Sequence, residues 1–115
     1  MDRLLRRRDF LAAAKGPSCS TASFVMRARD RADGKPARVG FTCTKKLGNA
    51  VHRNRIRRRL KEAVRLTMPV IAQASHDYVL IGKAAALTRD FEAIRKDIIS
   101  ALQKLHGTPN RTEQT

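Results

Sequence analysis

A long amphipathic helix in the middle of the chain is the feature that most constrains the fold. Asn49, after Gly48, predicts an N-cap, and the helix is expected to run to about Met68, where Pro69 ends it. Positions spaced at 100° per residue form one mainly apolar stripe, made by Ile56, Leu60, Ala63, Val64 and Thr67. Such a helix can bury its stripe against a sheet while its other sides remain in water.

The other sides of this helix carry an unusual density of cations. Residues 53–61 hold six of the chain's 25 Lys and Arg residues, and residues 45–65 hold nine cations against one acid, Glu62. Cations near a helix start oppose the helix dipole, and no acid at i−4 relieves their repulsion. An arrangement this unfavourable for the isolated chain predicts a polyanionic partner. Arginine forks and the amide of Asn54 suit phosphate and ribose groups, so we predict that the partner is a nucleic acid.

The composition agrees with one folded domain that binds a polyanion. The 115 residues are 42% hydrophobic, enough for a modest core, and the formal net charge is +15 with a pI near 11.4. RNA, DNA or an anionic membrane surface would relieve that charge. No stretch approaches the roughly 20 apolar residues of a membrane span, and we predict no membrane partner. We expect a single RNA-binding domain over residues 1–107 and a flexible polar tail over residues 108–115.

The cysteines and one arginine pair bear on the cellular compartment. Cys19 and Cys43 are too few and too far apart for a zinc module or a disulfide framework, so we expect free, partly buried thiols in a reducing cytoplasm. Residues 7–11 match a twin-arginine export motif, but the apolar run that should follow ends at Ala14. We therefore predict a cytoplasmic protein.

The remaining segments predict a small sheet with packed helices. Apolar and polar residues alternate in residues 20–29 and 38–44, and Asp33-Gly34 between them predicts a hairpin connection. The apolar run from Tyr78 to Ile81 is typical of a buried central strand. The expected elements are a helix at 7–15, strands at 20–29 and 38–44, the basic helix, a strand at 77–82 and a last helix. The first helix has Phe10, Leu11 and Ala14 on one side. The last helix has Thr88 as its cap and Gly107 at its end, and its core face consists of Phe91, Ile94, Ile98, Ala101, Leu102 and Leu105. The predicted fold class is α+β, a small mixed sheet with helices in the order α-β-β-α-β-α.

No group of side chains has the spacing of a catalytic site. The ten acids are scattered, and Asp90 and Asp97, which share a helix face, are two turns or about 10 Å apart. His52, His76 and His106 lack the spacing of metal ligands. His52 either contacts a phosphate or is a solvated helix residue. We predict no catalytic residue and no metal-binding residue in this chain.

The basic helix and its lead-in match a family signature. Residues 45–58 read Lys-Lys-Leu-Gly-Asn-Ala-Val-His-Arg-Asn-Arg-Ile-Arg-Arg. An Arg-Asn-Arg helix after Lys-Lys and Gly-Asn-Ala-Val resembles the protein subunit of bacterial ribonuclease P, and the likeness extends over about residues 3–105. The resemblance implies a ribosomal-protein-like fold in which the Arg-rich helix forms a left-handed β-α-β crossover, against the general rule.

The resemblance also implies a function and partners. In this family the RNA subunit is the catalyst, and it uses bound Mg²⁺ to hydrolyse the phosphodiester that releases the 5′ leader from precursor tRNA. The protein is the non-catalytic subunit of this endonuclease; it binds the RNA subunit and the leader, and we expect a monomer in a 1:1 complex with the RNA. The residues that would face RNA are Lys45, Lys46, Asn49, His52, Arg53, Asn54, Arg55, Arg57, Arg58, Lys61 and Arg65.

Three further residues match positions of the family's leader-binding cleft: Phe10, Phe24 and Arg27. Core packing is the alternative for Phe10 and Phe24. The chain departs from some relatives, because Ala14 and Arg27 stand where an aromatic residue is often found. Lys61 replaces a common Arg, which exchanges a bidentate fork for a point charge.

Other classes of function are compatible with the same basic helix. A ribosomal-type RNA-binding protein or an RNA chaperone would use it without any processing role. A self-sufficient protein nuclease would cleave RNA without an RNA subunit. A helix-turn-helix DNA binder is disfavoured, because strands and not a partner helix flank the basic helix.

Overall fold

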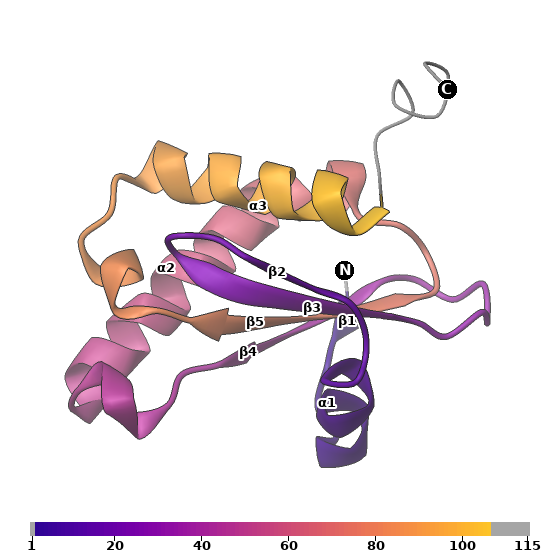
Figure 1. Cartoon of the computed structure of the whole chain (residues 1–115), viewed down its shortest axis with the longest axis horizontal. Helices are drawn as coiled ribbons and strands as arrows, with labels where there is room; N and C mark the ends of the chain where they lie inside the picture. Colours follow the sequence, from indigo (N-terminus) through magenta and orange to yellow (C-terminus); the bar gives the residue numbers. More distant parts are fainter. Residues whose placement is uncertain (1, 107–115) are drawn as a thin grey trace.

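A computed structural model describes residues 2–106, with the side chains of Val70 and Ile71 excepted (Figure 1). The strands are β1 (Asp2–Arg3), β2 (Ser18–Ser20), β3 (Phe24–Asp30), β4 (Arg38–Thr42) and β5 (His76–Gly82). The helices are α1 (Arg7–Ala13), α2 (Ala50–Ile71) and α3 (Phe91–His106), with short 3₁₀ turns η1 (Lys45–Leu47) and η2 (Ala84–Leu87).

The predicted α+β order is confirmed for the helices and the three longer strands. The sequence did not predict β1 and β2, since strands of two or three residues are too short to show alternation. The tail predicted for residues 108–115 lies outside the described residues.

The five strands form one mixed sheet in the order β1-β4-β5-β3-β2. β5 is central and buried, as its apolar run predicts; it pairs antiparallel with β3 and parallel with β4. The predicted hairpin between β3 and β4 is therefore wrong. The turn at Asp33-Gly34 exists, with Gly34 at a φ of +68°, but the two strands separate and β5 lies between them.

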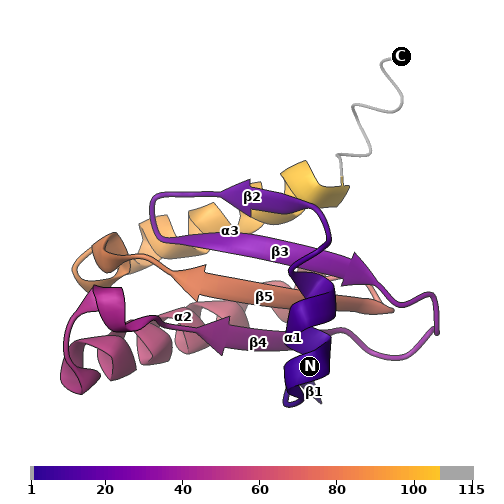
Figure 2. The ribbon, with the colours of Figure 1, turned by 60° about the horizontal axis from the view of Figure 1, so that its bottom comes forward.

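The connection from β4 through α2 to β5 is left-handed. Figure 2 shows β4 and β5 pointing the same way, α2 behind the sheet, and β5 displaced to the side that a left-handed turn requires. Nearly all β-α-β connections are right-handed, so the handedness that the resemblance implies is a distinctive property of this fold.

Helices cover the two faces of the sheet unequally. α2 and α3 pack on one face, and α1 covers part of the other (Figures 1 and 2). The predicted stripe of α2 is confirmed, because each of its five residues is at most 5% exposed. The core face predicted for α3 is also confirmed, with Phe91 and Leu105 partly buried at its ends. The apolar core between the sheet and these two helices fixes the orientation of α2 and thereby of its cations.

Two predicted helix boundaries are wrong. α2 continues through Pro69 to Ile71, and the N–H of Ala72 still bonds the carbonyl of Met68 at 2.7 Å. A proline in the last turn removes only its own N–H bond, and Pro69 lies on the exposed side of the helix. Thr88 does not cap α3. Asp90 does, and its carboxylate accepts the N–H of Ala93 at 3.3 Å.

The buried face of α1 also differs from the prediction. Leu11 is 53% exposed and Ala14 is exposed, whereas Asp9 and Ala13 are buried. A carboxylate therefore takes a place on the packed side of a short helix. Within residues 2–106, no helix combines the length and the apolar character that crossing a bilayer requires.

Candidate nucleic-acid interface

The start of α2 is held by its own polar side chains. The side-chain oxygen of Asn49 accepts the N–H of His52 at 3.0 Å, so the predicted cap is confirmed. Gly48, at a φ of +114°, turns the chain from η1 into the helix, and Arg53 donates to its carbonyl at 3.0 Å. η1 places Lys45 and Lys46, both exposed, directly before this start. The two lysines and the first turn of α2 thus belong to one rigid lead-in.

The cations of α2 lie on the solvent side and lack acidic partners. Among residues 2–106, no carboxylate comes within ion-pair distance of Lys45, Lys46, Arg53, Arg55, Arg57, Arg58 or Lys61. Arg57 donates to the side chain of Asn54 at 3.2 Å, which orients both groups. Arg55, Arg58 and Lys61 are exposed. The structure therefore brings the predicted cations together on one helix, with their charge unneutralised.

Two cations of α2 differ from this group. Arg65 donates to Glu62, which raises the pKa of Arg65 and lowers that of Glu62, so its charge is partly compensated. Arg59 turns away to the carbonyl of Arg89, in the turn before α3. Arg59 thus fastens α2 to the next element, in agreement with its absence from the predicted RNA-facing residues.

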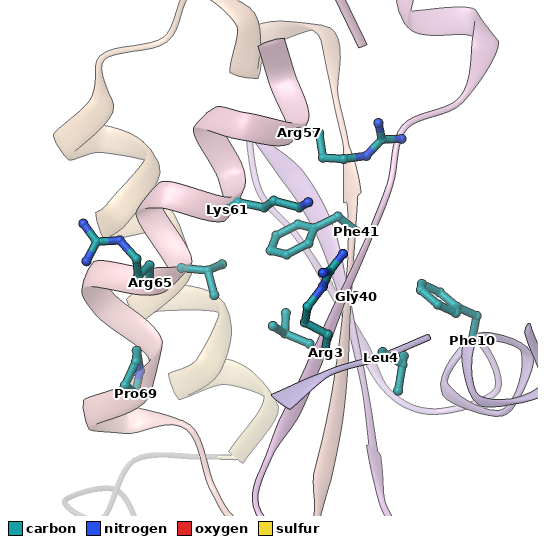
Figure 3. Close-up of a pocket in the computed structure, with 11 residues that line it drawn as sticks. Arg3, Leu4, Phe10, Gly40, Phe41, Arg57, Lys61, Arg65 and Pro69 are labelled. Atoms are coloured by element: carbon teal, nitrogen blue, oxygen red, sulfur yellow. The ribbon is translucent and has the colours of Figure 1, made fainter. Parts of the chain in front are cut away.

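A groove of about 530 Å³ lies beside α2, at the edge of the sheet (Figure 3). β1 pairs with β4 only at Arg38 and Val39, so the edge of β4 is open from Gly40 onward. α2 forms one wall, β4 the floor, and β1 with α1 the other wall (Figure 3). Within the described part of the chain, the lining combines an apolar floor with four cations and no acid: Arg3, Leu4, Phe10, Val39, Gly40, Phe41, Arg57, Lys61, Val64, Arg65 and Pro69.

A second depression of about 470 Å³ continues this groove. The two share Phe10, Phe41 and Arg57, so a single channel leads from the last turn of α2 past the open edge of β4 to α1. The additional lining residues are Leu5, Arg7, Leu11, Thr42 and Cys43. Burial raises the pKa of the Cys43 thiol against the opposing effect of Arg57 and Arg53, so the wall there is a neutral thiol.

The three residues predicted for the leader-binding cleft have three different positions. Phe10 lines the groove; a Cβ at Gly40 would lie 2.5 Å from the Cζ of its ring, so the ring keeps this position only above a glycine. Phe24 is 0% exposed in the core below α2 and α3, and its assignment to a cleft is wrong. Alternation groups residues by face but does not say which face is open. Arg27 lies on the α1 side, where it donates to the carbonyl of Ala14 at 3.2 Å and does not line the groove.

Sequence reasoning missed Phe41, the central aromatic residue of the groove. Alternation in residues 38–44 does not say which side chains are open to solvent, and Phe41 packs only partly on the core. Its exposure follows from the shortness of β1, which no local pattern signals. Within the described residues, no three His, Cys, Asp or Glu side chains lie close enough together to hold a metal ion.

Known proteins share both the sequence and the fold. The family described as Ribonuclease P matches residues 1–106. A ribonuclease P protein component from Caulobacter vibrioides is 48% identical over 111 residues, which cover 96% of this chain and 74% of that protein. One from Ruegeria pomeroyi is 46% identical over 107 residues, which cover 90% and 86%. The solved RNase P protein from Thermotoga maritima matches with a TM-score of 0.77 at 28% identity, over 93% of this chain and 100% of that one.

Proposed function

The chain belongs to the bacterial ribonuclease P protein family, and we propose that it holds two RNAs on two adjoining surfaces. It is the protein subunit of a ribonucleoprotein endonuclease that acts in 5′ processing of precursor tRNA. In the proposal, the outer side of α2 with its lysine lead-in binds the RNA subunit, and the groove at the β4 edge binds the 5′ leader.

The observation that carries the first contact is the unneutralised charge of α2. Seven cations of η1 and α2 have no acid partner among residues 2–106, on a helix whose opposite side is locked into the core. A rigid row of arginines matches the spaced phosphates of a folded RNA without further ordering.

The groove supports the second contact. Phe41 in its floor, Phe10 in its wall and the aliphatic side chains around them offer apolar surface to unpaired bases, while Arg57 and Lys61 at the rim offer charge to phosphates (Figure 3). Among the described residues, the cations that line the channel are Arg3, Arg7, Arg57, Lys61 and Arg65, and in the proposal they bind and orient the phosphates of the leader. The Mg²⁺ that the family implies would be bound mainly by the RNA subunit, and its chemistry would be to supply an activated water for hydrolysis.

A reconstituted assay tests both contacts. With the RNA subunit at low Mg²⁺, the chain should accelerate cleavage of precursor tRNA, and the holoenzyme should bind a precursor with a leader more tightly than mature tRNA. Phe10→Leu keeps the apolar volume but removes the ring, and should reduce that preference by about fivefold. Phe91→Leu changes another partly buried aromatic residue, on α3 and outside the lining of the groove; it is the control and should not.

Three outcomes would count against the proposal. Unchanged cleavage on addition of the chain would favour an RNA-binding or chaperone role without processing. Cleavage by the chain alone would favour a protein nuclease. A holoenzyme indifferent to the leader would remove the groove from the proposal and leave the α2 contact.

A further inference from the structure

A row of charged side chains crosses the sheet beneath α1. In the strand register, Asp77 of β5 lies opposite Arg29 of β3 on one side and Arg38 of β4 on the other. Tyr78 and Leu80 point to the α2 side, so Asp77 lies on the α1 side with Val79. The row is therefore a consequence of the pairing of three strands.

Asp77 is the centre of this row. Its side chain is 0% exposed and accepts hydrogen bonds from Arg29 at 2.9 Å, from Arg38 at 2.7 and 2.8 Å, and from Arg31. Burial alone would raise the pKa of Asp77, but the bonds from Arg38 and Arg31 outweigh it and lower the pKa. Three guanidinium groups around one carboxylate leave the row with excess positive charge on its α1 side.

Asp9 of α1 meets that excess charge. One of its carboxylate oxygens lies 3.5 Å from Arg29 and the other 3.6 Å from Arg38, and its side chain is 13% exposed. α1 has only seven residues, and its large aliphatic residue, Leu11, faces mostly solvent. A helix this short is unstable by itself, so its position depends on what holds it to the sheet.

We infer that Asp9 is a positioning residue for leader binding: its ion pairs with Arg29 and Arg38 hold α1 on the sheet and so keep the ring of the adjacent Phe10 over Gly40 as a wall of the groove. The inference rests on the proposed binding of the leader in that groove. It assigns a role to an acid inside a strongly cationic protein, at a place where a carboxylate would itself repel RNA if it were exposed.

The geometry leaves little tolerance. The virtual Cβ at Gly40 lies 2.5 and 2.7 Å from two atoms of the Phe10 ring and 3.0 Å from Leu4, so the ring sits directly on the strand backbone. Rotation of α1 by a small angle would lift this contact and widen the groove at its aromatic end. The outer side of α2 lies across the sheet and would not move.

The test is a double-mutant cycle on the reconstituted holoenzyme, with Asp9→Asn, Phe10→Leu and the combined variant. The measured quantity is the ratio of affinities for leader-bearing precursor and mature tRNA. Asp9→Asn should lower this ratio by about fivefold and should have almost no further effect in the Phe10→Leu background, because the first residue acts through the second. Affinity for the RNA subunit should remain within about twofold of wild type.

Two controls complete the design. Asp33→Asn makes the same charge change on an acid that pairs with Arg31 of the cluster without touching α1, and it should leave the ratio unchanged. Asp9→Glu keeps the charge and should restore most of the ratio. Should Asp9→Asn not fold, the cycle is run with Asp9→Ala, which also removes the charge and favours the helix, under the same criterion of non-additivity.

The outcomes separate the inference from its premise. A wild-type holoenzyme without leader preference would overturn the proposed leader contact itself. A wild-type preference combined with additive effects of the two substitutions, or with no effect of Asp9→Asn, would overturn the positioning role alone.

Discussion

The molecule contains two arginine clusters with opposite environments. On α2, Arg55 and Arg58 are exposed and have no acid partner among the described residues. Beneath α1, Arg31 and Arg38 are mostly buried and share the carboxylate of Asp77. In our proposal the arginines of α2 therefore bind RNA, whereas those beneath α1 stabilise the fold.

The comparison shows why charge counts alone do not locate a binding surface. The arginines of the Asp77 cluster contribute to the net charge of +15, yet their guanidinium groups already donate to Asp77 inside the protein. Arg55 and Arg58 of α2 are exposed and keep their donors available for an external acceptor. Pairing and burial, and not the number of cations, decide which cluster an RNA can use.

Salt should separate the two clusters most strongly. If about six cations of α2 and its lead-in meet phosphates, affinity for the RNA subunit should fall by about a thousandfold between about 50 and 200 mM salt. The melting temperature of the free protein should change little over the same salt range, because salt screens the buried ion pairs of the Asp77 cluster only weakly. Filter binding and thermal melts measure both, and an affinity that does not respond to salt would contradict the role of α2.

Removal of Asp77 should have the next largest effect, and on stability. Asp77→Asn leaves Arg31 and Arg38 without their shared anion, and the free energy of unfolding should fall by about 3 kcal/mol. Asp33→Asn makes the same charge change at an exposed site and should be nearly neutral. Urea unfolding of the two variants decides the matter; equal effects would show that the central carboxylate is not the anchor of the cluster.

Single arginines of α2 should have smaller effects, on binding. Arg55→Ala and Arg58→Ala should each weaken RNA-subunit binding by about tenfold, with unchanged melting temperature, because both lie off the buried stripe. Arg59→Ala removes the same charge from the same helix but also a bond to the carbonyl of Arg89. It should lower the melting temperature more than the RNA affinity, and the reverse pattern would show that exposure does not distinguish these arginines.

The sequence predicted the parts of the molecule that local patterns determine. The stripe and cap of α2, the buried run of β5 and the core face of α3 follow from periodicity within one segment. The insertion of β5 between β3 and β4 depends on pairing between distant segments. The predicted hairpin is wrong because strands that are consecutive in the sequence do not have to pair with each other. The left-handed crossover could be predicted only through the family resemblance.

The candidate site, like the fold, was predictable only where a local sequence pattern determines it. The cations of α2 could be read from their density and from the stripe beside them. The groove could not, because it depends on where β1 stops and on which side of the sheet each strand residue faces. For this reason Phe24, predicted for the cleft, is buried in the core, whereas Phe41 lines the groove. The position of Asp9 could not be predicted, since nothing local indicates that two strand arginines will lie beneath it.

A third polar group, independent of both arginine clusters, should give the smallest effect. Tyr78 accepts the N–H of Gln73 and lies 2.6 Å from Nε2 of His106, which places the hydroxyl proton toward a neutral imidazole. Burial, and then the nearby His76, lower the pKa of His106 below its ordinary 6.5. As the pH falls below about 6.5, the unfolded chain therefore takes up a proton that the folded chain resists, and stability decreases until the lowered pKa is passed. Arginines do not titrate in this range, so neither cluster contributes.

His106→Gln should flatten the change in melting temperature between about pH 7 and 5.5. A change of the same size in the variant would assign the pH dependence to another group.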